Sequence, residues 1–194
     1  MKRTLTLLTA FLLAVPMTAC STKKEEEKPQ TLEQTSEENY TANDFDTQDH
    51  YTAALGDYTF EIPDNYRNKQ PNYFIENTSP DQIAFLLLHK DDTVVVPSYE
   101  LLAFGIDTYI NGVMEGFEDA KLIEKGETNI NGIPMSTFTI TGITSGVDGI
   151  LHAYVFVNPS DHVVLGAFFV QSTGAKYDHF ADFDKIVGSI KPAE

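Results

Sequence analysis

Two apolar segments near the C-terminus constrain the fold more than any other feature of the sequence. Residues 149–157 and 162–172 flank a turn-forming Asn-Pro-Ser-Asp at 158–161 and are predicted to pair as an antiparallel hairpin. We predict a register in which Val157 faces His162. Valine, leucine and phenylalanine then occupy both faces of the hairpin. A sheet that is apolar on both faces must be covered on each side, so the chain needs two covering layers.

Two segments with helical periodicity are available as covers. The first spans residues 98–117, with Ser98 as the predicted N-cap. Its apolar residues recur at helical spacing, at Leu102, Ile106, Tyr109, Ile110, Val113, Met114 and Phe117. Gly105, Gly112 and Gly116 weaken this helix and would allow close approach of the sheet or a ligand. The second segment ends the chain, with Tyr177, Phe180, Phe183, Ile186, Val187 and Ile190 at similar spacing.

The remaining apolar segments predict further strands. They are Tyr58–Ile62, Asn72–Glu76 and Ile83–His89, followed after the first helix by residues 121–130 and 133–141. Asn131-Gly132 joins the last two, and this dipeptide is a strong signal for a tight hairpin. We therefore predict an α+β domain over residues 56–194, in the order βββ-α-ββββ-α. Its antiparallel sheet would be covered by helices on both faces, as an α/β/α sandwich.

The N-terminus predicts export. Lys2 and Arg3 precede an apolar stretch at residues 5–15, which is too short to span a membrane. The following Met17-Thr18-Ala19-Cys20 resembles the lipobox of bacterial lipoproteins. That resemblance implies removal of residues 1–19 as a signal peptide and a diacylglycerol on Cys20, the only cysteine of the chain. The alternative is an ordinary secretory signal with a chance cysteine.

Residues 20–55 are predicted to form a disordered acidic linker. The stretch from 21 to 50 holds nine acidic residues against three lysines and has few apolar residues. A flexible linker of this length reaches roughly 30 Å. Asp44, Asp46 and Asp49 loosely suggest a calcium loop, but the sixth position lacks glycine and the twelfth, Leu55, is not glutamate.

The folded region resembles a known family. The opening YTFEIPDNY, the long central helix, the successive strands and the closing FDKIVGSIK are similar to the PsbP-like fold, over residues 56–191. Members of that family include extrinsic photosystem proteins and many bacterial lipoproteins. They often carry tryptophan after the first proline, where this chain offers Tyr66. The resemblance implies an accessory or binding role more often than catalysis, although a fold does not fix a function.

The sequence contains no recognisable catalytic or metal-binding motif. Its five histidines lack metal-ligand spacing, and they are His50, His89, His152, His162 and His179. His152 is either a hydrogen-bonded core histidine or a polar group that lines a pocket. No nucleophile elbow or phosphate-binding glycine loop occurs, and residues 144–149 predict only a connection between strands. We expect no enzymatic activity, cofactor or metal.

The net charge and the aromatic residues limit the classes of partner that we expect. The net charge is −16, and −18 once Lys2 and Arg3 are removed with the signal peptide, which argues against nucleic acid. Tyr66, Tyr73 and Tyr99 lie in or beside predicted loops and are either a binding patch or partly buried loop residues. We expect a lipid-anchored binding or accessory protein on the outer face of the cell membrane, with an unknown envelope protein as partner. The alternatives are a carrier of a small apolar ligand between sheet and helix, or an unrecognised hydrolase.

Overall fold

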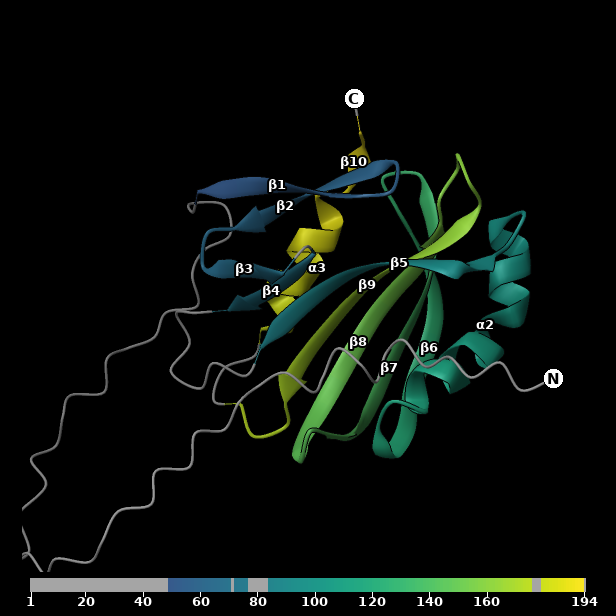
Figure 1. Cartoon of the computed structure of the whole chain (residues 1–194). Helices are drawn as coiled ribbons and strands as arrows, with labels where there is room; N and C mark the ends of the chain where they lie inside the picture. Colours follow the sequence, from purple (N-terminus) through teal and green to yellow (C-terminus); the bar gives the residue numbers. More distant parts are fainter. Residues whose placement is uncertain (1–48, 71, 77–83, 176–178, 194) are drawn as a thin grey trace, which may run out of the picture.

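The computed structural model describes residues 49–70, 72–76, 84–175 and 179–193. The predicted signal peptide (1–19), Cys20 and the predicted linker up to residue 48 lie outside the described residues. Figure 1 shows the described chain as a broad twisted sheet with α2 on one side and α3 near the small sheet.

The larger sheet has seven strands in the order β3-β4-β5-β9-β8-β7-β6, and every neighbouring pair is antiparallel. Among the described residues, the helices are α2 (Tyr99–Met114) and α3 (Phe180–Gly188). The strands are β3 (Tyr66–Gln70), β4 (Tyr73–Glu76), β5 (Phe85–Val95), β6 (Glu118–Ile130), β7 (Ile133–Thr144), β8 (Val147–Val157) and β9 (Val163–Ser172). The predicted α+β class, a mainly antiparallel sheet with two helices, is confirmed.

A smaller sheet corrects the predicted boundary of the domain. It has the order β1-β2-β10, with β1 at His50–Leu55, β2 at Tyr58–Pro63 and β10 at Lys191–Pro192. Strand β1 falls in the predicted linker, so the folded region begins before residue 56. The sequence gives a weak signal for this strand, because the residues before it are mostly polar and only Ala53 and Leu55 of β1 are buried. Strands β3 and β10 were likewise not predicted.

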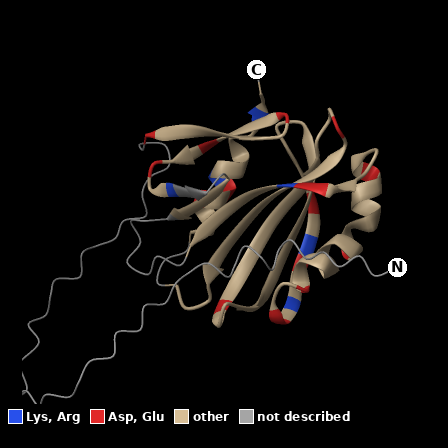
Figure 2. Ribbon diagram, viewed as in Figure 1, with Lys and Arg blue, Asp and Glu red and all other residues tan. Residues whose placement is uncertain are grey.

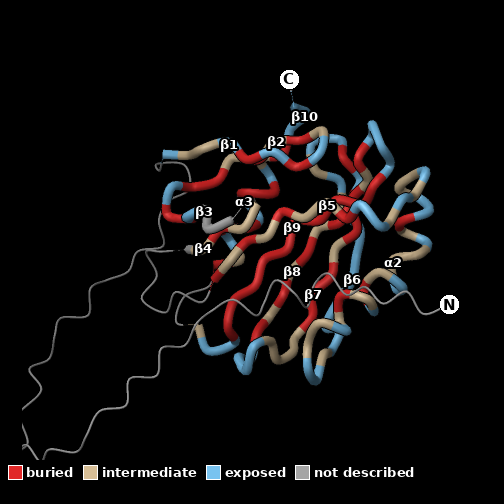
Figure 3. The backbone as a smooth tube through the Cα atoms, viewed as in Figure 1, coloured by how far each residue is buried: buried red, intermediate tan, exposed pale blue. Residues whose placement is uncertain are grey.

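Alternate residues of the central strands contribute to two separate apolar clusters. The α2 cluster contains Leu102, Ile110, Val113, Phe138, Ile140, Leu151, Ala153, Val155, Val164, Phe168 and Val170. The α3 cluster joins Phe183, Ile186 and Val187 to Phe156, Leu165 and Phe169 of the large sheet and to Phe60 and Ile62 of β2. The second cluster therefore depends on the small sheet as well as on a helix. Figure 3 shows the central strands as the most deeply buried part of the molecule.

The hairpin of β8 and β9 differs from the prediction in register. Val157 pairs with Val164 and His152 with Phe169, a shift of two residues. The connection is longer than expected because the His162 amide donates to the Asn158 carbonyl at 2.9 Å, while the Asn158 amide donates to the Val163 carbonyl. Since side chains alternate with a period of two, this shift leaves every residue on its predicted face. The β6–β7 turn is confirmed, with positive φ at both Asn131 and Gly132.

Candidate functional site

Helix α2 forms because one side of it is apolar and packs on the sheet. Leu102, Ile110 and Val113 are almost fully buried in the α2 cluster. Ser98 occupies the N-cap position as predicted, although its side chain makes no cap hydrogen bond to the backbone. Burial of this stripe holds the helix in place, since hydrophobic packing and not intrinsic propensity stabilises most protein helices.

The outer side of α2 carries an apolar surface that the fold does not use. The side chain of Phe104 is 91% exposed and that of Leu101 is 51% exposed. A Cβ atom added to Gly105 would meet no heavy atom within 4 Å, so this glycine faces open space and not the sheet. We call Leu101, Phe104 and Gly105 the α2 ridge. Exposed apolar residues are common when they occur singly, but two of them together on one packed helix make this surface a candidate contact site.

A further exposed apolar residue lies at the end of β5, shortly before the helix in the sequence. Val95 is 61% exposed and lies four residues before Tyr99, the first residue of α2. The amide of Val96 donates to the His162 carbonyl at 2.9 Å, which fixes the β8–β9 loop against this junction. The β8–β9 loop therefore contacts the segment between β5 and α2.

Acidic groups on α2 and in the β8–β9 loop form ion pairs with lysines of the sheet. In the β8–β9 loop, Asp161 pairs with Lys90 at 2.6 Å, and its hydrogen bonds to Lys90 and to Asn158 lower the pKa of its carboxyl to about 2. Lys90 also lies 3.7 Å from Asp92. Helix α2 contributes Glu100 and Asp107 and contains no lysine or arginine. Figure 2 shows acidic but no basic segments along α2.

The five histidines lie in different elements of the structure. His50 lies in β1, His89 in β5 beside Phe168, His162 in the β8–β9 loop and His179 at the start of α3. Within the described ranges, no group of three or more histidine, cysteine, aspartate or glutamate side chains is placed to hold a metal ion.

His152 is held among polar and aromatic neighbours on the α3 side of the sheet. Its Nδ1 lies 2.7 Å from Thr139 Oγ1, and that hydroxyl also donates to Glu124 at 3.1 Å. The imidazole packs edge-on against Phe180 and Phe183. Burial lowers the pKa of His152, against the opposing effects of Asp184 and Glu124. These contacts occupy the ring and favour a packed, hydrogen-bonded histidine.

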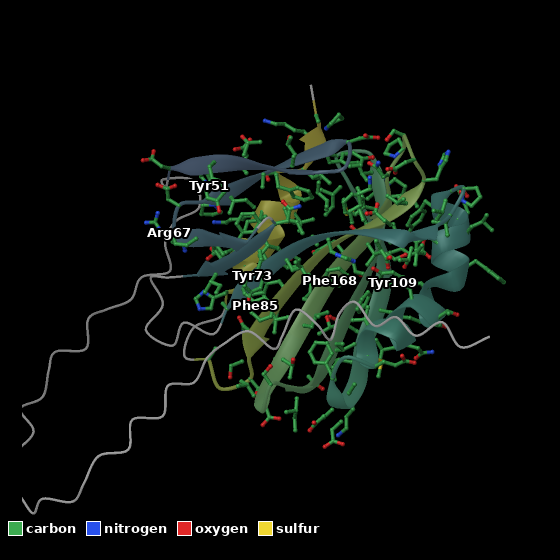
Figure 4. The ribbon with its side chains drawn as sticks, in the orientation of Figure 1. Tyr51, Arg67, Tyr73, Phe85, Tyr109 and Phe168 are labelled. Carbon is green, nitrogen blue, oxygen red and sulfur yellow. The ribbon has the colours of Figure 1, made fainter. Side chains whose placement is uncertain are left out.

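The three tyrosines suggested for a binding patch have different surroundings. Tyr66 is buried in the α3 cluster, whereas Tyr73 packs against Phe85 with ring centroids 5.3 Å apart. The hydroxyl of Tyr99 lies 3.3 Å from Ser136 Oγ. Figure 4 shows Tyr73 and Phe85 together at one end of the sheet, with Phe168 and Tyr109 nearer α2. The structure does not bring these tyrosines together.

The α2 ridge was missed in the sequence, although a signal for it exists. Leu101 and Phe104 lie outside the predicted apolar stripe of the helix, which begins at Leu102. Large apolar residues outside such a stripe have no place in the core, so they are candidates for an exposed contact surface.

Comparison with known proteins shows the fold alone. No family model and no curated protein matches this chain. Among solved structures, it is similar to PA94, a protein of unknown function from Pseudomonas aeruginosa, at 15% identity and a TM-score of 0.54, covering 75% of this chain and 98% of that one. It is also similar to LpqN of Mycobacterium tuberculosis, at 12% identity and a TM-score of 0.51, covering 75% and 92% of the two chains.

A third similar structure is CyanoP, a PsbP protein of Synechocystis, at 12% identity and a TM-score of 0.48, covering 79% of this chain and 96% of that one. In the part of the chain that the structure describes, no helix is long and apolar enough to cross a membrane.

Proposed function

We propose that this chain is a non-enzymatic accessory protein, anchored by lipid at Cys20 on the outer face of the cell membrane, and that it binds a partner protein through the α2 ridge. The observation that carries the proposal is the 91% exposure of Phe104 on a helix whose opposite side packs on the sheet. Aromatic residues dominate the binding energy of protein interfaces, so a solvent-exposed phenylalanine is a suitable anchor for a partner.

The envelope location is supported by the sequence and by one comparison. The signal-like residues 1–19 and the single Cys20 fit a lipid-anchored protein, and two acyl chains give a stable membrane anchor where one does not. LpqN is described as involved in cell envelope biogenesis, although its likeness to this chain extends only to the fold.

The packing of the described residues favours a partner on the outside of α2 over a ligand beneath it. Leu102, Ile110 and Val113 occupy the space between helix and sheet and are almost fully buried there. Gly105, which would have allowed a ligand to approach from the sheet side, faces open space instead. We therefore place the binding function on the ridge.

Photo-crosslinking in the native host tests the binding function. A benzophenone amino acid replaces Phe104 in one strain and Val147, an exposed apolar residue of β8, in a matched control strain. We expect irradiation to give a discrete adduct at position 104 and none at 147, identified by mass spectrometry. Absence of an adduct at 104, or the same adducts at both positions, contradicts the proposal.

The anchor is tested separately with a clickable fatty acid. We expect wild-type protein to be labelled and to sediment with membranes, whereas the Cys20→Ala protein is unlabelled and is not retained on the membrane. Labelled, membrane-bound Cys20→Ala protein would contradict the lipid attachment site.

A further inference from the structure

We infer that the large sheet carries a second binding site, distinct from the α2 ridge, for a small amphipathic carboxylate such as a free fatty acid. The apolar chain of this ligand lies on β4 and the start of β5, on the same side of the sheet as α2, and its carboxylate binds Arg67. The inference goes beyond the proposed function, because it assigns a small molecule to another surface.

Helix α2 covers only part of its side of the sheet. Its main contacts are with β6, β7 and β8. Figure 1 shows β3 and β4 at the end of the sheet that is farthest from α2. The other described helix, α3, packs in the cluster on the opposite side. Among the described residues, β4 and the start of β5 therefore have no covering helix on the α2 side.

Strand pairing places four large apolar side chains together on this uncovered part. Ile75 pairs with Phe85, and Tyr73 pairs with Leu87. Phe85 and Leu87 pack against the α2 cluster, whereas Leu86 between them belongs to the α3 cluster, so the four side chains lie on the α2 side. All four are half-buried and keep exposed surface. We call Tyr73, Ile75, Phe85 and Leu87 the β5 face.

The β5 face is continuous with apolar structure. The rings of Tyr73 and Phe85 contact each other, and Figure 4 shows them side by side. On the α2 side of β9, Phe168 pairs with Leu87 and contacts the ring of His89. Burial raises the pKa of Tyr73 and lowers the pKa of His89, which indicates low polarity at both ends of the face. A hydrocarbon chain on this face therefore stays in an apolar environment.

The size of the β5 face favours a small molecule over a protein. It consists of two rows of side chains on two neighbouring strands, which corresponds to roughly 100–200 Å². A stable protein interface buries about 800 Å² on each partner. The face alone is thus too small for a second copy of this chain or for another protein, and it matches a single apolar chain.

Arg67 sets the charge of the head group. It pairs with Ile75 across β3 and β4, and the preceding residue, Tyr66, is buried in the α3 cluster, so Arg67 lies on the side of the β5 face. Its side chain is exposed, and none of the ion pairs between described side chains involves it. A guanidinium binds a carboxylate through two parallel hydrogen bonds. In a chain with a net charge of −16, this arginine selects an anionic head group at one end of the face.

Isothermal titration calorimetry with dodecanoate, kept below its critical micelle concentration, tests the site. The full mature chain, residues 20–194, carries Cys20→Ala so that no detergent is needed. We expect one dodecanoate to bind per chain. Arg67→Gln should weaken binding by about tenfold or more, because a charge-assisted hydrogen bond is lost. The control is Lys121→Gln, which removes an exposed positive charge from β6 at the opposite edge of the sheet and should change affinity by less than about twofold.

Two further measurements test the head group and the location. Dodecyltrimethylammonium has the same chain with a positive head and should bind about tenfold or more weakly than dodecanoate. In methyl NMR spectra, dodecanoate should shift the signals of Ile75 and Leu87. The signals of Ile123 and Leu122, which are exposed on β6, should stay unchanged. This readout needs no substitution in the site, so it decides the location even if a variant fails to fold.

The inference is overturned if dodecanoate does not bind, if Arg67→Gln and Lys121→Gln have equal effects, or if the signal of Ile123 shifts and that of Ile75 does not. Binding to phosphatidylglycerol vesicles without binding of dodecanoate, or a dimer formed through the β5 face, would also overturn it by assigning another occupant. None of these results bears on the adduct at position 104, so the proposed function stands or falls separately.

Discussion

Phe104 and Phe183 have the same side chain but differ in burial, since one is exposed on α2 and the other lies in the core. Phe183 is fully buried and stacks on Phe169 with ring centroids 5.1 Å apart, whereas Phe104 is almost fully exposed. We predict that Phe183→Ala lowers the free energy of unfolding by about 3–5 kcal/mol. Phe104→Ser should change it by no more than about 0.5 kcal/mol. Urea unfolding followed by circular dichroism measures both, and a large loss in Phe104→Ser would show that the ridge belongs to the core.

The loop beside the ridge is held by a network of polar side chains. Asn158 Oδ1 accepts from the Asp57 amide at 2.8 Å, and its Nδ2 donates to Asp161 at 2.7 Å. Asp57 in turn accepts from the amide and the hydroxyl of Ser160. The network joins the β1–β2 turn to the β8–β9 loop. Buried Asn158 is thus a structural residue, and the network holds the β8–β9 loop against the β1–β2 turn.

The pKa of Asp161 gives this network a pH dependence. Its hydrogen bonds to Lys90 and Asn158 lower the pKa from 3.8 to about 2 in the folded protein. The stabilisation is therefore fully present above pH about 4 and is lost as the pH falls towards 2. We predict that Asp161→Asn is less stable than wild type at neutral pH and that the difference shrinks steadily as the pH falls from about 4 through 2. Thermal unfolding at a series of pH values measures it, and a difference that grows on acidification would contradict the assignment.

At the scale of the element, a glycine inside α2 lowers the intrinsic stability of the helix, and packing on the sheet compensates for this loss. Gly105 lies inside the helix and faces open space, so Gly105→Ala adds helix propensity without a clash. We predict an increase of about 0.5–1 kcal/mol in the free energy of unfolding. The matched control is Gly142→Ala in β7, whose added Cβ would lie 2.9 Å from Phe117 Cβ and 3.1 Å from the Glu118 carbonyl. That change should destabilise, and equal effects at both positions would argue against an open ridge.

At the scale of the whole molecule, the small sheet decides where the domain begins. Strand β1 buries Leu55 and Ala53 in the α3 cluster, and the Tyr51 hydroxyl donates to the Tyr66 carbonyl at 2.8 Å. We predict that a chain starting at residue 56 is less stable than one starting at residue 49 by more than the 2–5 kcal/mol typical of losing one buried leucine. Urea unfolding of the two chains measures this. Equal stabilities of the two chains would show that β1 does not contribute to the folded domain.

Local patterns in the sequence determined the strands of the two-faced hairpin, the Asn131-Gly132 turn and the buried stripe of α2. Each depends on residues close together in the chain, whose periodicity or backbone preference acts locally. Tertiary structure decided the rest. The length of the β8–β9 loop set the register, and pairing with β2 placed β1, of which only two residues are buried, in a sheet. The exposure of Leu101 and Phe104 also depended on packing, because only the docking of α2 on the sheet selects which of its apolar residues are buried and which remain for a partner.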